Sequence, residues 1–228
     1  RLNLIYATGR HFESVRDAMQ QHALPAPGWF VCDVGTSIYR REQNAFVRFA
    51  PFEEMLAGQT RGADRKDVEQ LLAGINGLTL QSAEQQQRFK ISYVSSADDA
   101  ERLAALANRR LAGSHLPFAC LTSIDPFHNI GLLDILPVGA SKAAALLWLA
   151  THADFNPDEI IFAGDSGNDF AALACGFRAI VVANAPAGLA DRVERELTRR
   201  DLASRLFRAT RPATSGVLEG CRHFGLVS

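Results

Sequence analysis

The sequence is poor in cysteine, the residue that cross-links small secreted proteins and builds soft metal sites. Its 228 residues include only four cysteines, which stand far apart and form no Cys-x-x-Cys pair. This spacing argues against a zinc site and against a disulfide-bonded scaffold. We therefore expect Cys32, Cys120, Cys175 and Cys221 to be reduced and partly buried.

Long apolar runs and an excess of one charge are lacking too. No apolar stretch approaches the roughly 18 residues that a membrane span needs, and no secretory leader is recognisable. The formal net charge is -1 and basic pairs such as Arg40 with Arg41 are scattered, which disfavours nucleic acid as a partner. We expect a cytoplasmic protein that acts on a small molecule, with neither nucleic acid nor a membrane as its partner.

Several common catalytic signatures are absent. The chain contains no Gly-x-Ser-x-Gly elbow, no Gly-x-Gly-x-x-Gly fingerprint and no P-loop, and its six histidines are dispersed. A serine hydrolase, a dinucleotide-dependent dehydrogenase and a zinc enzyme are therefore disfavoured. Since 47% of the residues are hydrophobic, the chain can still bury a substantial core.

The strongest positive signal is the stretch IIFAGDSGNDFAAL at residues 160–173. Its apolar start predicts a buried strand, its polar middle at 164–169 a loop, and its end a helix. The carboxylates of Asp165 and Asp169, with neutral residues between them, suit a hard divalent cation such as Mg²⁺. The alternative is that Asp165 only caps the following helix. We favour the metal site because two acids, an asparagine and two glycines gather at one strand end.

The first residues show the same succession of strand, loop and helix. Residues 4–6 predict a strand, and apolar residues at helical spacing between 12 and 19 predict a helix. Between them, Thr8, Gly9 and Arg10 offer a hydroxyl, backbone amides and a guanidinium, which can hold a phosphate at a helix N-terminus. Taken alone, this loop fits an ordinary cap and turn equally well.

The middle of the chain alternates more closely between strands and helices. We predict strands at 30–34, near 89–93 and at 118–124, a hairpin turn near 40–44, and helices within 51–74 and 98–111. Lys90 lies opposite Phe89 and Ile91 in its predicted strand, so it points either at a ligand or into water. We expect water, the usual environment of a lysine.

Lys142 stands at the start of a predicted helix whose body, 143–150, is apolar. A lysine there is unfavourable for the helix dipole. It is either a surface residue or a cation held near the acidic loop, where it would neutralise a phosphate and the carboxylates; its place after a strand-ending loop favours the second. Beyond it we predict a strand at 179–182 and a mostly helical remainder with a loop at 212–216.

Three of these stretches resemble motifs of a known superfamily. ATGR at 7–10, the lysine of DILPVGASKAAAL at 134–146 and GDSGND at 164–169 resemble motifs two, three and four of the haloacid dehalogenase (HAD) superfamily. The stretches WFVCDVGTSIY, RFKISY and IVVANAP resemble its sucrose-phosphate phosphatase branch, which consists of Cof-type sugar phosphatases with a C2-type cap. The likeness covers nearly the whole chain.

The resemblance implies an α/β fold with a Rossmann-like core and a parallel sheet, formed by residues 1–50 and 134–228. Residues 51–133 would be an inserted α+β cap of the C2 type that closes over the sugar. It also implies a Mg²⁺-dependent phosphatase that hydrolyses a phosphorylated sugar, first of all sucrose 6-phosphate, through an aspartyl-phosphate intermediate. The implied site residues are Thr8 and Lys142 for catalysis, Asp165 and Asp169 for Mg²⁺, Thr8, Gly9, Arg10 and Asn168 for the phosphate, and Ser166 as a support for the metal ligands.

The sequence departs from this family in two ways. The family begins with a strand that ends in Asp-x-Asp and carries the nucleophile, and nothing before Thr8 supplies it; a strand and its crossover would add about 30 residues. We expect such a segment to precede the chain. The alternative is a noncatalytic domain that is attached to or assists a sucrose-phosphate synthase-type glycosyltransferase. Ser37 and Ala143 also replace a family acid and glycine, so another glycoside phosphate remains an alternative substrate.

Overall fold

The computed structural model describes residues 2–125 and 128–227, which form two compact units, Arg1–Ser141 and Lys142–Ser228. The domain division that the sequence suggested, with a cap at 51–133, stays a prediction.

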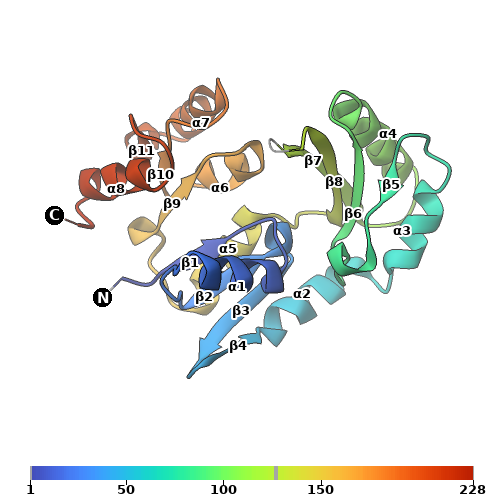
Figure 1. Cartoon of the computed structure of the whole chain (residues 1–228), viewed down its shortest axis with the longest axis horizontal. Coiled ribbons are helices and arrows are strands. Elements are labelled where there is room, and N and C mark those ends of the chain that lie inside the picture. The colour runs from blue at the N-terminus through green and yellow to red at the C-terminus, as the bar shows by residue number, and fades with distance from the viewer. Residues whose placement is uncertain (1, 126–127, 228) are drawn as a thin grey trace. The chain divides into compact units, whose positions relative to one another are not determined.

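The first unit contains two four-stranded sheets, ordered β1-β2-β3-β4 and β5-β6-β8-β7. In the first sheet β1 and β2 are parallel and the other pairs antiparallel, whereas the second sheet is antiparallel throughout. The elements of this unit (Figure 1) are β1 (Ile5–Ala7), α1 (Phe12–Gln21), β2 (Trp29–Cys32), β3 (Ser37–Glu42), β4 (Ala45–Arg48), α2 (Ala50–Thr60), α3 (Arg65–Leu72), β5 (Thr79–Leu80), β6 (Ile91–Ser96), α4 (Ala100–Ala112), β7 (Phe118–Asp125) and β8 (Ile130–Pro137).

Helix α1 covers the first sheet through the apolar positions that its sequence spacing predicted. Phe12 lies edge-on against Phe30 at 5.5 Å between ring centroids and stacks on Tyr39 at 4.2 Å. Val15 and Met19 follow at helical spacing and pack against the same cluster. This packing fixes the start of α1, and therefore the loop before it, against β2.

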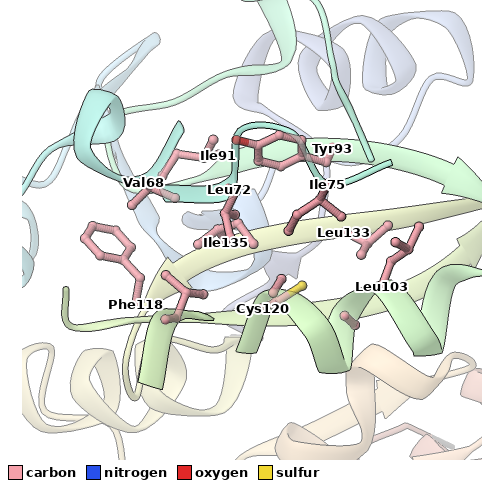
Figure 2. Close-up of a cluster of buried hydrophobic side chains, with 13 residues drawn as sticks. Val68, Leu72, Ile75, Ile91, Tyr93, Leu103, Phe118, Cys120, Leu133 and Ile135 are labelled. Carbon is pink, nitrogen blue, oxygen red and sulfur yellow. The ribbon is translucent and has the colours of Figure 1, made fainter. Parts of the chain in front are cut away.

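The second sheet is held by a larger apolar cluster (Figure 2). Alternate residues of β7 and β8 face the cluster, such as Leu133 and Ile135, because successive strand side chains point to opposite faces. Helix α4 contributes Leu103, Ala107 and Leu111, which are buried at 0%, 0% and 2% exposure. The predicted apolar face of this helix is thus confirmed, and α3 adds to the same cluster.

The second unit is built on a parallel sheet ordered β11-β10-β9. Helices α7 and α8 flank β10 and β11 from opposite sides (Figure 1). With the mixed sheets of the first unit, this arrangement confirms the α/β fold class. The elements are α5 (Lys142–His152), β9 (Ile161–Gly164), α6 (Phe170–Leu173), β10 (Arg178–Val181), α7 (Leu189–Thr198), β11 (Leu206–Arg208) and α8 (Ala213–His223).

The C-terminal part differs from the sequence-based prediction. Strand β11 was not predicted, and the expected loop at 212–216 is wrong because α8 begins at Ala213. Gly216, within the predicted loop, lies on the buried face of α8: a Cβ there would lie 2.2 Å from the carbonyl oxygen of Arg211 and 3.0 Å from Val182 Cγ1, and a Cβ on Gly220 would lie 2.5 Å from Ile180 Cδ1. These glycines serve close helix-to-strand packing and do not mark turns.

The cysteines agree with expectation. All four are free, Cys32 and Cys120 are buried, and Cys175 and Cys221 are partly buried. Burial raises the pKa of Cys120 to about 12, so this thiol is inert at neutral pH.

The cluster of Figure 2 gives a stability prediction. Leu133→Ala empties a fully buried position and should lower the free energy of unfolding by about 2–5 kcal/mol. Leu121→Ala on the neighbouring strand, where the leucine is 41% exposed, should change it by less than about 0.5 kcal/mol. Urea unfolding of both variants checks this; equal losses would contradict the assignment of the core.

Candidate functional site

The acidic loop after β9 is organised by the carboxylate of Asp169. Its Oδ1 atom accepts a hydrogen bond from Lys142 Nζ at 2.7 Å. Its Oδ2 atom accepts from the backbone N–H groups of Asp165 and Ser166 at 3.3 and 3.2 Å, and from Ser166 Oγ at 2.8 Å. One carboxylate therefore fixes both the loop backbone and the ammonium group at the start of α5.

Glycine at position 164 makes this arrangement possible. A Cβ on Gly164 would lie 2.8 Å from the Cβ of Asp169, closer than real side chains approach. Asn168 joins the same network, since its Oδ1 accepts from Lys142 Nζ at 2.9 Å and lies 2.7 Å from Ser166 Oγ, whose one proton it shares with Asp169. The predicted site residues Lys142, Ser166, Asn168 and Asp169 are thus brought together within the second unit.

The Lys142–Asp169 ion pair is buried, with side-chain exposures of 6% and 8%. Burying two charges costs desolvation energy, which is offset only when hydrogen bonds satisfy the remaining polar atoms, as they do here. The position of Lys142 beside the acidic loop agrees with the functional alternative of the sequence analysis. The surface alternative for this lysine is wrong.

Asp165 differs from Asp169 because its side chain is exposed. Its Oδ2 accepts from Asn184 Nδ2 at 3.2 Å, and Asn184 Oδ1 in turn accepts from the backbone N–H of Ala213 at 2.7 Å. The helical turn that follows is closed by a capping box of Ser166 and Asp169. The alternative that Asp165 serves only as the helix cap is therefore wrong, and its carboxylate is open to a ligand.

The donor set for a metal is partial. Across residues 2–125 and 128–227, no group of three or more His, Cys, Asp or Glu side chains is placed to hold a metal ion. Asp165 offers the oxygen chemistry that Mg²⁺ prefers. Asp169 stays a predicted metal ligand, but both of its oxygens are already engaged in the loop.

The loop of Thr8, Gly9 and Arg10 lies in the first unit, directly before α1. The Thr8 N–H donates to the carbonyl of Val31 at 2.8 Å, and the Thr8 carbonyl accepts from the N–H of Val34 at 3.2 Å. The Arg10 N–H donates to Thr8 Oγ1 at 3.2 Å. Because a helix N-terminus favours anions, a loop at this position suits a phosphate.

Beside this loop lies Asp33, for which the sequence predicts a place in a strand at 30–34; the strand ends at Cys32 instead, and Asp33 begins a tight turn. It is 0% exposed, and neither carboxylate oxygen has a hydrogen-bond partner among the described residues. Asp33 and Val34 both adopt left-handed backbone conformations, with φ of 54° and 59°. Such residues cost about 1–3 kcal/mol each and gather at functional sites. Burial raises the pKa of the Asp33 carboxyl, and the charge of Lys90 is the largest effect against it.

The expectation that Lys90 points into water is wrong. Its side chain is 7% exposed, with Nζ 3.7 Å from Asp134 Oδ1 and 3.5 Å from the carbonyl oxygen of Gly9. Its neighbours on the chain, Phe89 and Ile91, are buried as well. The alternation of apolar and polar residues in the sequence could not predict that Lys90 is buried, because both faces of the strand are covered here.

Comparison with known proteins shows which family the chain belongs to. A sucrose-6F-phosphate phosphohydrolase family profile matches residues 1–225. A HAD-like hydrolase of Nitrosococcus oceani is 34% identical over 97% of this chain, which spans only 62% of that protein's length. The mannosylfructose-phosphate phosphatase of Agrobacterium fabrum is 28% identical, with 98% of this chain and 83% of the relative covered.

A solved structure shows the same fold. The sucrose-phosphatase of Synechocystis in complex with sucrose and phosphate matches with a TM-score of 0.77 and 25% identity, over 98% of this chain and 84% of that one. The fold is that of the haloacid dehalogenase superfamily. Within that superfamily, the chain belongs to the sucrose-6F-phosphate phosphohydrolase family. No helix among the described residues is long and apolar enough to cross a membrane.

The two acids of the loop should differ in their effect on stability. Asp169→Asn removes the counter-charge of the buried Lys142 and should lower the free energy of unfolding by about 3–5 kcal/mol. Asp165→Asn changes an exposed side chain and should change it by less than about 0.5 kcal/mol. Urea denaturation monitored by circular dichroism checks both. An Asp169→Asn protein as stable as Asp165→Asn would contradict the described network.

The buried Asp33 carboxyl makes stability depend on pH. Its pKa is raised in the folded state, so this residue's contribution to stability falls as the pH rises from about 3.9, the ordinary value, through the folded pKa. Lys90, Arg48 and His11 are the basic groups around it. Asparagine tolerates a left-handed backbone. The Asp33→Asn variant should therefore become more stable than wild type as the pH rises through this window, and should be no more stable than wild type below it. Urea midpoints at several pH values test this; a gain that does not change with pH would contradict it.

Proposed function

We propose that the protein is a Mg²⁺-dependent phosphatase that hydrolyses a phosphorylated disaccharide, with sucrose 6-phosphate as the first candidate substrate. The observation that carries the proposal is the buried Lys142–Asp169 pair beside the open carboxylate of Asp165, at the end of a parallel strand. Ligands in open α/β sheets bind at the carboxyl ends of strands. Family membership supports a phosphate ester as the ligand.

The roles of the two loops follow from their chemistry. In this proposal the Thr8 hydroxyl and the neighbouring amides of the first unit bind the phosphoryl oxygens, and Arg10 adds an exposed positive charge. Lys142, held in one orientation by Asp169, stabilises the charge that develops on the phosphoryl group. Preorganised donors of this kind are among the larger contributions to catalysis because they need no reorientation during the reaction.

The donor set fits Mg²⁺ in part. Asp165 would supply one carboxylate ligand, and Asn184, which bonds its Oδ2, would hold that carboxylate in place. Asp169 remains a second candidate ligand; its engaged oxygens support a role in orienting Lys142. When bound, Mg²⁺ would neutralise negative charge on the phosphoryl oxygens.

The nucleophile is the part that these residues do not supply. We propose that it is an aspartate of an Asp-x-Asp segment outside the 228 residues, as in the family. The strand order supports an added strand: β1 lies at the end of its sheet and pairs with β2, and β9 lies at the end of its own sheet and pairs with β10. Each of these strands has an edge that an added strand can use.

The substrate class rests on the names of the family and of one relative. The family is named after sucrose 6F-phosphate, and the Agrobacterium relative is named after mannosylfructose phosphate. Both compounds are phosphate esters of fructose-containing disaccharides. We therefore place these two first and glycerate glycoside phosphates second. A cytoplasmic location belongs to the same proposal and is supported by the four free cysteines.

The test is phosphate release by the full-length protein from a panel of sugar phosphates, with Mg²⁺ and with a chelator. The proposal predicts Mg²⁺-dependent release from sucrose 6-phosphate or mannosylfructose phosphate above simple hexose phosphates. Failure to release phosphate from any ester with Mg²⁺ present would favour the noncatalytic alternative.

Lys142→Ala should reduce kcat by about 10²–10³-fold because it removes a preorganised charge next to the transferring group. Lys66→Ala, at an exposed position on α3, is the matched control and should leave kcat unchanged. Steady-state kinetics with folded protein, verified by circular dichroism, decides this. Near-normal turnover in the Lys142 variant would remove that residue from the mechanism.

A further inference from the structure

Lys90 is a buried cation that the proposed mechanism does not use. It precedes β6 in the second sheet of the first unit, yet its Nζ atom lies 3.5 Å from the carbonyl oxygen of Gly9 in the loop before α1. Its charged neighbours are the buried Asp33, whose pKa the charge of Lys90 lowers, and Asp134, whose Oδ1 lies at 3.7 Å and already accepts from Ser92 Oγ at 2.6 Å. A lysine is rarely buried without a specific partner, so its contact with Gly9 needs an explanation.

The carbonyl groups of the Thr8–Arg10 loop are all held from outside the loop. The Thr8 carbonyl accepts from the N–H of Val34 at 3.2 Å, and the Arg10 carbonyl accepts from the N–H of Asp33 at 3.0 Å. Lys90 holds the third carbonyl, that of Gly9. The strained turn at 33–34 and Lys90 together therefore set the direction of each peptide group in the loop.

The peptide bond between Gly9 and Arg10 connects this contact to the Thr8 side chain. In a trans peptide the C=O and the N–H point in opposite directions, so a cation on the Gly9 oxygen turns the Arg10 N–H to the other side. There the Arg10 N–H donates to Thr8 Oγ1 at 3.2 Å. A hydroxyl that accepts from this amide keeps its own proton free to donate to another acceptor.

We propose that Lys90 is a positioning residue for the phosphate loop. By holding the Gly9 carbonyl it orients the Arg10 N–H onto Thr8 Oγ1, and the Thr8 hydroxyl is thereby aimed, proton outward, at a phosphoryl oxygen. The inference rests on the proposed function only in the identity of the anion. Lys90 would thereby connect the second sheet of the first unit to phosphate binding through its own side chain.

The proposal is tested with Lys90→Met in the full-length protein. The Arg10 amide should exchange its hydrogen about fivefold to tenfold faster, the loss expected for one hydrogen bond. The dissociation constant for inorganic phosphate and the KM of the phosphorylated sugar should rise by the same factor, with a smaller change in kcat. Lys90→Arg, which keeps the charge and donors, should restore all three. Lys66→Met, the same substitution at an exposed lysine, should match wild type.

A purely structural role predicts a different pattern. If Lys90 only neutralises Asp33, Lys90→Met would lower the amount of folded enzyme with KM and phosphate affinity unchanged, and adding Asp33→Asn would repair the defect. Under the proposal the double variant regains stability but not phosphate affinity. Unchanged Arg10 exchange and phosphate affinity in Lys90→Met, or affinity restored in the double variant, overturns it. A wild-type protein without turnover would refute the phosphatase assignment, while the Arg10 exchange rates would still decide the role of Lys90.

Discussion

The carboxylate of Asp169 is the constraint on which the acidic loop depends. It lies under the loop because Gly164 has no side chain, it accepts two loop amides, and it holds the Lys142 ammonium out of water. A charge pair buried in this way is weak evidence for stability, because apolar side chains would serve as well. Its geometry has another consequence: it leaves Asp165 as the open carboxylate of the loop and presents Lys142 in one fixed orientation.

In the first unit, the Thr8–Arg10 loop is held in part by strained backbone. Asp33 and Val34 take left-handed conformations, and their N–H groups hold two carbonyls of the Thr8–Arg10 loop. Lys90 supplies the third contact from the second sheet. Both loops are thus held by groups that are buried and charged or strained, and functional sites are where such costs are retained.

Much of this could be predicted from the sequence because its cues were local. Helical spacing placed Phe12 and Leu103 on the packed faces of their helices, partly buried in the first case and fully buried in the second, and the glycine-rich acidic stretch marked a strand end. The environments of Lys90 and Asp33 depend on contacts between distant parts of the chain, which no local pattern contains. The loop predicted at 212–216 was wrong for a different reason, since Gly216, a residue type typical of turns, here allows close packing of a helix. The roles of the site residues remain predictions.

The central claim is that the acidic loop after β9 is a site for Mg²⁺ and phosphate, with Asp165 as the metal ligand and Lys142 as the cation that faces the phosphate. The most direct measurement is a crystal structure of the full-length protein with Mg²⁺ and a tetrahedral or planar phosphate analogue. We predict that the metal lies on Asp165 and that the analogue lies within hydrogen-bond distance of Lys142 Nζ. A metal bound away from Asp165, or an analogue out of hydrogen-bond reach of Lys142, would contradict this claim.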